Sequence, residues 1–350
     1  MVVAYPGRAP AEEVVRLEDR ETGLDGVIVI HSTALGPGAG GCRLWDYADI
    51  DAAAADAFRL AEGMSYKNAM AGLPFGGAKA VLRRPAGDFD RRALFRAFGR
   101  AVADLRGRYV TAEDVGTRVS DMREVAAVTR HVAGLEAKAG GAGGDPSPWT
   151  ARGVVESIRA AASFALESDL RGLRVAVQGT GNVGSEVCRL LADAGAELTI
   201  ADMAPERRDR LAAILGARVV DVDAIAAADV DIFAPCALGG VLDARSVPSM
   251  KARIVCGAAN NQLAAPAVAD MLFDRGIAYV PDYVANAGGI ISVSAEYLGE
   301  GAPRVGARVA QIGPRVTMIL DEARHRRLSP ATVADRMAER LIAERVRRVA

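Results

Sequence analysis

Lys67 and Lys79 are the two residues whose side-chain type most clearly suggests chemistry. Only four of the 43 basic residues in the chain are lysines, and the others are arginines. Arginine cannot lose its proton in a protein, whereas a buried lysine can be tuned to do so. A bias toward arginine codons explains why lysine is rare. Lys67 and Lys79 are then either two lysines that this bias happened to leave in place or residues that take part in chemistry. Lys138 and Lys251 are interpreted as solvated loop residues.

Other reactive residue types lie close to these lysines in the sequence. The glycine-rich stretch GPGAGGCRL (36–44) offers backbone N–H groups to an anion, and Lys79 follows two glycines, where the backbone can approach a ligand closely. The predicted strand 108–114 ends in Glu113 and Asp114, and a carboxylate beside a lysine makes a proton-transfer pair. Because side chains alternate along a strand, we expect Glu113 to point away from Asp114. Taken alone, these segments also fit loops with two structural ion pairs.

A dinucleotide-binding pattern occurs in the second half of the chain. Its GxGxxG block, GTGNVG, consists of Gly179, Thr180, Gly181, Asn182, Val183 and Gly184. The block follows a predicted strand and opens a predicted helix, where glycines permit a tight turn, approach to a pyrophosphate and close helix packing. The alternative is a glycine-rich turn that binds nothing.

Asp202 ends the next predicted strand, where an acidic residue can accept hydrogen bonds from a ribose 2′-hydroxyl. Its charge would repel a 2′-phosphate, which favours NAD over NADP. Arg207 and Arg208 follow closely and leave some use of NADP open.

Composition excludes several other classes of function. Basic and acidic residues number 43 and 44, so no broad basic face is expected and a nucleic-acid partner is not predicted. The three histidines lack metal-ligand spacing, which predicts no metal site. No GxSxG or phosphate-binding P-loop pattern is present to start acyl or phosphoryl transfer.

The chain is expected to be a cytoplasmic protein without a membrane segment. Its N-terminal sequence lacks the basic and apolar regions of a signal peptide, and no stretch of eighteen apolar residues follows. The four cysteines are widely spaced, lie in apolar surroundings and form no CxxC pair, as expected for reduced thiols: Cys42, Cys188, Cys236 and Cys256.

The order of predicted elements indicates an α/β protein of two domains. Strands at 26–33, 78–84 and 108–114 alternate with helices that begin near residues 49 and 91, and the segment AGGAGGDPSP (139–148) is typical of a linker. Beyond it, strands and helices alternate strictly, which predicts a doubly wound parallel sheet. We expect domains at 1–145 and 146–325, a hinge at 139–148, and a C-terminal helix at 326–350 that packs back on the first domain.

Six segments together resemble the L-amino-acid dehydrogenase superfamily, which acts on glutamate, leucine, valine and phenylalanine. They are GPGAGGCRLW, KNAMAGLPFGGAKA, TAEDVGT, GTGNVG, GAANNQL and ANAGG, and they occur in the family's order between about residues 26 and 300. The resemblance implies an N-terminal α/β domain for substrate binding and oligomerisation and a Rossmann domain that binds NAD. It also implies an active site in the cleft between them, small-molecule substrates and a homo-oligomer.

The same resemblance implies roles for the residues of the first domain. Lys67 would bind the substrate α-carboxylate, helped by backbone N–H groups around Gly40 and Gly41. Lys79 would be the catalytic lysine, with a lowered pKa in a closed site, and would activate the water that attacks the imine. Asp114 would carry protons to and from the amino group. The two lysines would then be retained for chemistry that arginine cannot perform.

Polar residues of the second domain would contact the cofactor or the substrate. Asn260 and Asn261 would lie near the nicotinamide, with Asn261 also reaching the substrate. Asn286 would lie near the nicotinamide ribose or the substrate amine, and Thr150 near the carboxamide. With GTGNVG and Asp202, these residues form the expected cofactor site.

Ala39 and Val293 would set the choice of amino acid. They stand where glutamate dehydrogenases have a lysine and a serine, so the cost of desolvating a γ-carboxylate would not be offset and an apolar substrate is expected. Leucine dehydrogenases usually have Leu in place of Ala39, and the smaller residue favours phenylalanine, which would give phenylpyruvate and ammonia. The alternatives are leucine or valine, or a non-catalytic NAD-binding sensor.

Overall fold

The computed structural model describes residues 10–135 and 142–349 of the chain. Among these residues the chain forms two compact units. Unit 1 contains the described residues up to 144, together with 293–302 and 338–349. Unit 2 contains residues 145–292 and 303–337.

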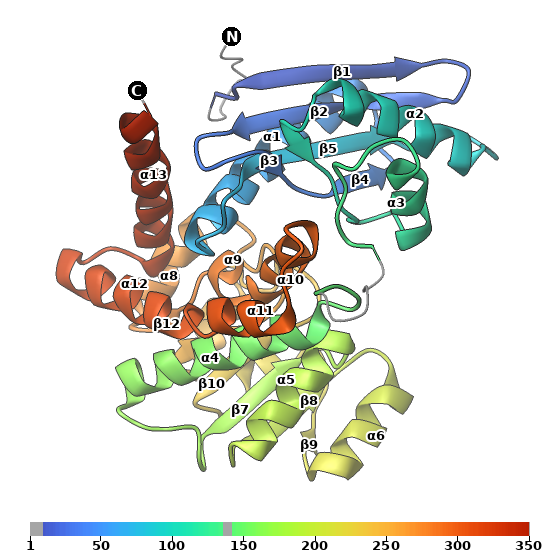
Figure 1. Cartoon of the computed structure of the whole chain (residues 1–350). Helices are drawn as coiled ribbons and strands as arrows, with labels where there is room; N and C mark the ends of the chain where they lie inside the picture. Colours follow the sequence, from blue (N-terminus) through green and yellow to red (C-terminus); the bar gives the residue numbers. More distant parts are fainter. Residues whose placement is uncertain (1–9, 136–141, 350) are drawn as a thin grey trace. The chain divides into compact units, whose positions relative to one another are not determined.

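Unit 1 is built around one mixed sheet, drawn from blue to green in Figure 1. Its elements before residue 144 are β1 (Glu13–Asp19), β2 (Leu24–Ser32), β3 (Gly38–Ala39), β4 (Cys42–Trp45), α1 (Ile50–Met70), β5 (Gly76–Arg83), α2 (Arg91–Asp104), β6 (Tyr109–Val110) and α3 (Val119–Ala126). Asp49 caps α1 by accepting a hydrogen bond from the N–H of Ala52 at 2.8 Å, as its position before the helix predicts.

The strand order of this sheet is β1-β2-β5-β3-β6, and β4 also pairs with β5. β1, β2 and β5 are antiparallel neighbours, while β3 and β4 run parallel to β5. Strand β5 therefore lies at the centre of the sheet, and seven of its eight residues are buried. The sequence correctly indicated a strand here, whereas β1 and the short strands β3 and β4 carry too few residues or too weak an alternation to be predicted.

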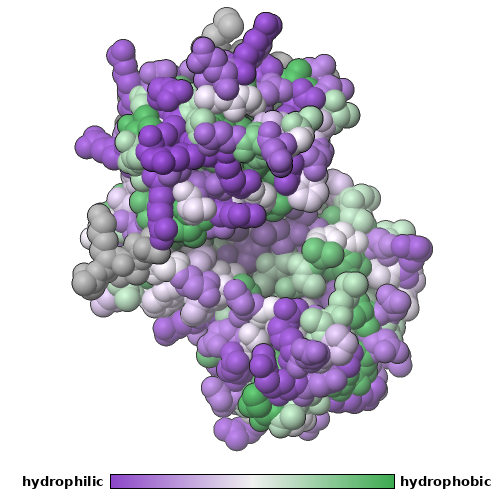
Figure 2. Space-filling view, turned by 90° about the vertical axis from the view of Figure 1, so that its right-hand side faces the viewer, coloured by the Kyte–Doolittle hydropathy of each residue, from purple (hydrophilic) through white to green (hydrophobic). Residues whose placement is uncertain are grey.

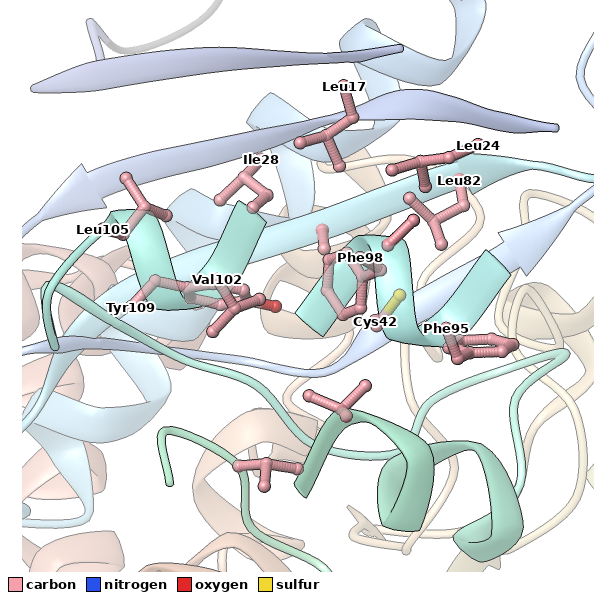
Figure 3. Close-up of a cluster of buried hydrophobic side chains, with 14 of the residues drawn as sticks. Leu17, Leu24, Ile28, Cys42, Leu82, Phe95, Phe98, Val102, Leu105 and Tyr109 are labelled. Atoms are coloured by element: carbon pink, nitrogen blue, oxygen red, sulfur yellow. The ribbon is translucent and has the colours of Figure 1, made fainter. Parts of the chain in front are cut away.

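The two faces of the sheet are covered by different helices. Small side chains of α1 pack on one face against Val27, Val29 and Val81. α2 and α3 cover the opposite face, where Ile28 and Leu82 of the sheet meet Phe95 and Phe98 in the cluster shown in Figure 3. Burying each such side chain contributes about 1.5–3 kcal/mol. A rigid core therefore supports both faces of β5.

Unit 2 contains a second sheet of six strands and its covering helices. Its elements up to residue 285 are α4 (Ser147–Leu166), β7 (Arg174–Gln178), α5 (Asn182–Asp193), β8 (Glu197–Ala201), α6 (Pro205–Leu215), β9 (Arg218–Val219), the 3-10 turn η1 (Ile225–Ala227), β10 (Ile232–Pro235), α7 (Ser246–Ser249), β11 (Ile254–Val255), α8 (Ala267–Asp274), β12 (Ala278–Tyr279) and α9 (Asp282–Ala285). The remaining helices are α10 (Gly288–Tyr297), α11 (Ala302–Val309), α12 (Ile312–Arg326) and α13 (Pro330–Val349).

All strand pairs of this second sheet are parallel, in the order β12-β11-β10-β7-β8-β9. This is the doubly wound Rossmann order, in which the chain starts at β7 near the middle and winds outward in both directions. The strict alternation of strands and helices predicted this sheet. Ligands of such sheets bind at the carboxyl ends of the strands, on either side of the point where the winding reverses.

The division into units differs from the predicted domains at residues 293–302 and at the start of the C-terminal helix. Residues 293–302 belong to unit 1, although the prediction assigned 146–325 to the Rossmann domain. Glu296 accepts hydrogen bonds from the N–H groups of Gly134 and Leu135 at 3.1 and 2.9 Å, and these contacts anchor the segment. Such long-range contacts leave no local mark in the sequence.

The C-terminal helix α13 begins at Pro330, four residues after the predicted start, and from residue 338 it belongs to unit 1. Tyr66 donates a hydrogen bond to Glu339 at 3.0 Å. The predicted hinge, 139–148, lies in part outside the described residues, and the boundary between the units at 144/145 falls inside it.

Hydrophilic residues cover most of the face shown in Figure 2, and the hydrophobic areas among them are scattered. Within the part of the chain that the structure describes, no helix combines the length and the apolar character needed to span a bilayer.

Candidate active site

Lys79 and Asp114 form a buried ion pair in unit 1. The ammonium nitrogen Nζ of Lys79 lies 2.8 Å from Oδ2 of Asp114, and the two side chains are 6% and 22% exposed. Lys79 lies on the central strand β5, and Asp114 follows the short strand β6. The structure thus joins the two residues that the sequence suggested as a proton-transfer pair.

Two opposing influences determine the pKa of Asp114. Burial raises it, whereas the charge and hydrogen bond of Lys79 and the charge of Arg43 lower it by more, so that the pKa of Asp114 lies below its ordinary value. The carboxylate is therefore ionised at neutral and alkaline pH, where it can accept a proton.

Close contacts at glycines explain how the two strands bring these groups together. A Cβ on Gly41 would lie 2.6 Å from the carbonyl oxygen of Glu113 and 2.8 Å from Cβ of Asp114. A larger residue at position 41 would therefore push the Asp114 segment away from the sheet. Glu113 itself is exposed, in agreement with the expected alternation of side chains.

Lys67 lies in the last turn of α1 and is partly buried. The end of this helix approaches the sheet closely, because a Cβ on Gly77 would lie only 2.1 Å from the backbone nitrogen of Ser65. A Cβ on Gly40 would similarly lie 1.9 Å from the carbonyl oxygen of Ala78. The glycines around Lys79 thus allow the helix that carries Lys67 to pack on the strand that carries Lys79.

The N–H of Gly40 is already used within unit 1. Its N–H donates to the carbonyl of Val110 at 3.2 Å as part of the sheet, so it is not available to a substrate carboxylate. The neighbouring N–H of Cys42 donates in the same way to Ala112 at 2.8 Å. Gly40 and Gly41 are required because neighbouring backbone segments pack closely against them. A glycine-rich sequence alone does not show whether its glycines serve packing or anion binding.

The two residues expected to select the substrate side chain both lie in unit 1. Ala39 is 7% exposed on β3, where it pairs with Gly77 of β5 and Val110 of β6. Val293 lies on α10 and is partly buried. Neither side chain carries a charge or a hydroxyl.

The GTGNVG block connects β7 to α5 in unit 2, as expected. Gly179 has φ +96°, a left-handed conformation that favours glycine, and its N–H donates to Ala201 at 2.8 Å. A Cβ on Gly184 would lie 1.9 Å from the carbonyl oxygen of Gly179, whereas a Cβ on Gly181 would meet no atom within 4 Å. Gly179 and Gly184 therefore shape the turn. Gly181 leaves space at the N-terminus of α5, beside the exposed Asn182 and the partly buried Val183.

Asp202 is held by more partners than the sequence suggested. Its Oδ2 accepts from the N–H of Thr180 at 2.6 Å and from the Thr180 hydroxyl at 3.0 Å, and its Oδ1 accepts from the N–H of Ala204 at 2.8 Å. Nη2 of Arg207 lies 2.8 Å from both oxygens. Internal donors thus already orient the carboxylate that is expected to accept ribose hydroxyls, and Arg207 offsets its charge.

The charge state of Asp202 follows from these contacts. Burial raises its pKa, but the hydrogen bonds from Ala204, Thr180 and Arg207 outweigh burial and lower the pKa to about 2. Arg208, the other nearby cation, pairs instead with Asp209 at 2.7 Å.

A cavity of about 480 Å³ lies over this part of unit 2. It is lined by residues that include Gly179, Gly181, Asp202, Met203 and Leu238. Met203 and Leu238 are 84% and 79% exposed, which is unusual for large apolar side chains. Met203 and Leu238 are suited to the adenine of a dinucleotide, the carboxylate of Asp202 to its ribose, and the helix N-terminus to its phosphates.

The predicted asparagines lie in loops that follow the strands of the second sheet. Asn286 is buried, and its Nδ2 donates to Oδ1 of Asn260 at 2.8 Å and to the carbonyl of Ala258 at 3.1 Å. Asn261 is exposed and has φ +52°. The structure thus joins Asn260 with Asn286 at the edge where the glycine loop also lies.

Thr150 lies in the first turn of α4, with its hydroxyl donating to the carbonyl of Pro146 at 3.1 Å. A Cβ on Gly289 would lie 2.7 Å from this hydroxyl oxygen, so the ANAGG segment packs directly on Thr150.

Sequence reasoning missed Arg43 as a residue of the site. Its Nε lies 3.1 Å from Oδ2 of Asp114, and its Nη1 lies 2.8 Å from Oδ2 of Asp56. The only signal in the sequence was its position in the GPGAGGCRL stretch, because its contacts depend on the register of β4 against β5.

The metal-ligating side chains and the cysteines are the other reactive groups of the described residues. Among residues 10–135 and 142–349, no group of three His, Cys, Asp or Glu side chains is arranged to hold a metal ion. The four cysteines are unpaired, and Cys236 alone is not fully buried.

Family models match both units. A model described as the dimerisation domain of Glu/Leu/Phe/Val dehydrogenases matches residues 12–131. A second model, described as Glutamate/Leucine/Phenylalanine/Valine dehydrogenase, matches residues 140–205 and 198–305.

Relatives and a solved structure agree with these models. The chain is 44% identical to leucine dehydrogenase of Geobacillus stearothermophilus over 95% of this chain and 90% of that protein. It is 46% identical to valine dehydrogenase of Streptomyces virginiae over 95% and 94%, respectively. The crystal structure of L-tryptophan dehydrogenase from Nostoc punctiforme matches with a TM-score of 0.87 at 37% identity, covering 96% of this chain and 97% of that one. The chain is therefore an NAD-dependent amino-acid dehydrogenase and belongs to the glutamate, leucine, phenylalanine and valine dehydrogenase family.

Proposed function

We propose that this enzyme catalyses the reversible oxidative deamination of a branched-chain aliphatic L-amino acid, leucine or valine. The products would be the 2-oxo acid, ammonia and NADH. The observation that carries the chemistry is the 2.8 Å contact between Lys79 and Asp114 in a site where Lys79 is 6% exposed. A protein that only sensed NAD would not need a lysine and a carboxylate held together in this way.

In the proposed mechanism, Asp114 takes a proton from the substrate amino group as the hydride leaves Cα, and a C=N bond forms. Bound NAD supplies the acceptor for that hydride. Lys79, in its neutral form, then removes a proton from the water that adds to the imine carbon. Asp114 then returns its proton to the nitrogen of the carbinolamine. As the C–N bond breaks and ammonia leaves, the carbinol hydroxyl gives its proton to the ionised Asp114, and the C=O bond of the 2-oxo acid forms. Lys67 binds the α-carboxylate throughout.

The residues around the glycine loop of unit 2 offer the groups that would hold NAD. The space beside Gly181 and the N-terminus of α5 suit the pyrophosphate, and Asp202 can receive ribose hydroxyls at the edge of the 480 Å³ cavity. Thr150, Asn260, Asn261 and Asn286 are proposed to hold the nicotinamide end.

The comparisons support leucine or valine more than phenylalanine. The leucine and valine dehydrogenases are 44% and 46% identical over nearly the whole chain. Ala39 favoured phenylalanine because its small side chain leaves room for a ring. It is only one position of the pocket, however, and larger side chains elsewhere can fill that room. The lack of a charge or hydroxyl at Ala39 and Val293 disfavours glutamate in either case.

The proposal is tested by a substrate panel of Leu, Val, Ile, Phe, Trp and Glu, with NADH formation followed at alkaline pH. We expect kcat/KM for Leu or Val to exceed that for Phe and Trp by at least about tenfold, the discrimination that one or two methylene groups provide in an apolar pocket. Highest activity with Phe would favour the phenylalanine alternative. No NADH from any of these amino acids would favour a non-catalytic NAD sensor.

Lys67→Met tests the carboxylate site. Losing a charged hydrogen bond to the α-carboxylate costs about 1.5–3 kcal/mol, so we expect the KM for the amino acid to rise by about 10- to 100-fold. The KM for NAD should change little. Lys251→Met, which removes an exposed lysine of unit 2, is the matched control. An unchanged amino-acid KM in Lys67→Met would exclude this role.

Asp202→Asn tests the ribose contact. The amide retains the size of the side chain but loses its charge, and we expect the KM for NAD to rise about tenfold, equivalent to ~1.4 kcal/mol, with little change in the amino-acid KM. Because the pKa of Asp202 is about 2, the wild-type carboxylate stays ionised throughout the assay range, and NAD affinity should show no titration from this group. Initial rates at varied NAD and pH measure both. Unchanged NAD kinetics in Asp202→Asn would refute the assignment.

We also propose that the chain forms a homo-oligomer through unit 1. The matching family model is described as a dimerisation domain, and β1 lies at the edge of its sheet, where backbone groups are suited to pairing. Light scattering after size-exclusion chromatography measures the number of subunits, and a monomer at micromolar concentration would contradict the proposal.

A further inference from the structure

Arg43 stands between two carboxylates in unit 1 and is mostly buried, with 18% of its side chain exposed. Through Nε it contacts Oδ2 of Asp114 at 3.1 Å, and through Nη1 it contacts Oδ2 of Asp56 at 2.8 Å. Two different nitrogens of one rigid guanidinium are thus used for two acids. Lysine has only one nitrogen and could not make both contacts in this geometry.

The oxygen of Asp114 that Arg43 contacts is the one that also contacts Lys79. Nζ of Lys79 lies 2.8 Å from Oδ2, and Nε of Arg43 lies 3.1 Å from the same atom. Two cations on a single oxygen restrict rotation of the carboxylate more than one would, because each holds it from a different direction. The direction of the second oxygen is thereby fixed relative to Lys79.

Asp56 in turn holds Arg43 in place. Its Oδ2 also accepts from the hydroxyl of Tyr47 at 2.6 Å, and its Oδ1 accepts from Nη2 of Arg59 at 2.7 Å. Burial and the hydrogen bond to Asp56 raise the pKa of Tyr47, so its hydroxyl remains a donor at assay pH. Burial raises the pKa of Asp56 too, but Tyr47, Arg59 and Arg43 lower it by more, and the carboxylate remains charged.

The chain of contacts also connects two secondary-structure elements that carry proposed active-site lysines. Asp56 and Lys67 lie on α1 eleven residues apart, about three helical turns, and therefore on the same face of the helix. Arg43 pairs in register with Val81, two residues after Lys79, so Arg43 and Lys79 project from the same face of the sheet. Arg43 thus links the helix of Lys67 to the carboxylate that pairs with Lys79.

We propose that Arg43, anchored by Asp56, is a positioning residue that fixes the orientation of the Asp114 carboxylate for proton transfer. This inference rests on the proposed role of Asp114. It assigns to Asp56 and Tyr47 the task of holding the guanidinium, and none of the three residues is required to touch the substrate.

The pH dependence of catalysis should also depend on Arg43. The groups around Asp114 are Lys79 of β5, Arg43 and Cys42 of β4, and Tyr109 of β6. Burial raises the pKa of the Cys42 thiol and of the Tyr109 hydroxyl well above their ordinary values, so both stay neutral in the assay range. Loss of the Arg43 charge removes one of the influences that lower the pKa of Asp114, and the acidic limb of the kcat/KM profile should move to higher pH.

The test compares Arg43→Gln, Arg43→Lys, Asp56→Asn and the double variant Arg43→Gln/Asp56→Asn. We expect Arg43→Gln to lower kcat at least about tenfold but by less than the ~10²–10⁴-fold that a proton-transfer group itself contributes. Arg43→Lys should remain impaired because one ammonium cannot make both contacts. Asp56→Asn should have a smaller effect, which disappears in the Arg43→Gln background, since coupled residues are not additive.

A rescue experiment separates positioning from a general loss of stability. A cavity of about 580 Å³ is lined by Arg43, Tyr47, Asp56 and Arg59 and gives small molecules access to this position. Added methylguanidinium should restore part of the activity of Arg43→Ala. Arg91→Ala is the control, because Arg91 forms a comparable ion pair with the buried Asp121 at 2.6 Å. It should lower thermal stability, leave the pH profile in place and show no rescue.

Two results would overturn the inference: a wild-type kcat and pH profile in Arg43→Gln, or the same shifted profile in the Arg91 variant. Should Arg43→Gln fail to fold, Asp56→Asn and the rescue of Arg43→Ala decide the question. Asp114→Asn is measured in parallel. High activity in Asp114→Asn would refute the proposed function itself, whereas an inactive Asp114→Asn with a normal Arg43→Gln would refute only the positioning role.

Discussion

Lys79→Ala is expected to lower kcat for oxidative deamination by about 10³-fold or more while NAD still binds. The ammonium of Lys79 is buried at 6% exposure against Asp114, so no other lysine can take its place from solvent. Removing a general base costs about 10²–10⁴-fold, and this residue would additionally lose its part in orienting Asp114. Steady-state rates and calorimetric titration with NAD measure the two properties separately.

Lys79→Arg distinguishes a base from a structural cation. The guanidinium retains the positive charge beside Asp114 but cannot give up its proton, so this variant should be nearly as inactive as Lys79→Ala. Both variants should be folded, as judged by thermal unfolding. Substantial turnover in Lys79→Arg would show that charge alone suffices and would remove the assignment of Lys79 as the base.

Asp114→Asn has the second-largest expected effect, a loss of about 10²- to 10⁴-fold in kcat, because the amide cannot accept the proton of the substrate amine. The neighbouring Glu113→Gln is the matched control, since Glu113 is exposed and should tolerate the change with an effect of about twofold or less. Rates for both variants at saturating amino acid and NAD check this prediction, which fails if the two variants are equally active.

The same variant has a stability signature whose sign follows from the lowered pKa of Asp114. A carboxyl whose pKa is lower in the folded than in the unfolded state contributes stability above its unfolded pKa, and that contribution is lost as pH falls through the folded pKa. At neutral pH, Asp114→Asn should therefore be less stable than the wild type. The difference in unfolding free energy should shrink in acid below the ordinary pKa of aspartate. Denaturant unfolding at several pH values measures it, and a constant difference would contradict the ion pair.

Local patterns predicted much of the fold. An aspartate, Asp49 or Asp51, before an alanine-rich run indicated the start of α1, which the structure places after Asp49. The alternation of strands and helices after residue 150 indicated the parallel sheet. Strand β1 and the addition of residues 293–302 to unit 1 depend on partners far away in the sequence, so no local pattern marked them.

The candidate site was predicted in part. Lys79 and Asp114 could be chosen by residue type, and the structure places them 2.8 Å apart. Arg43 could not be chosen, because arginine is common in this chain and its partners depend on strand register. The sequence did not reveal that the N–H of Gly40 donates to Val110 within the sheet. Asp202 was correctly placed after its strand, but its pairing with Arg207 could not be read from spacing alone.

Unit 1 is assembled from stretches that are made at very different times during translation. His131 lies 3.2 Å from the hydroxyl of Tyr297, and Phe75 packs edge-on against the same ring. Residues of the N-terminal segment thus have contact partners that are synthesised some 160 or more residues later. Tyr66 hydrogen-bonds to Glu339, and this partner is synthesised later still. A ribosome-bound chain can thus fold the Rossmann sheet before the unit that precedes it is complete, and cutting the gene near codon 145 would yield a fragment lacking part of its own core.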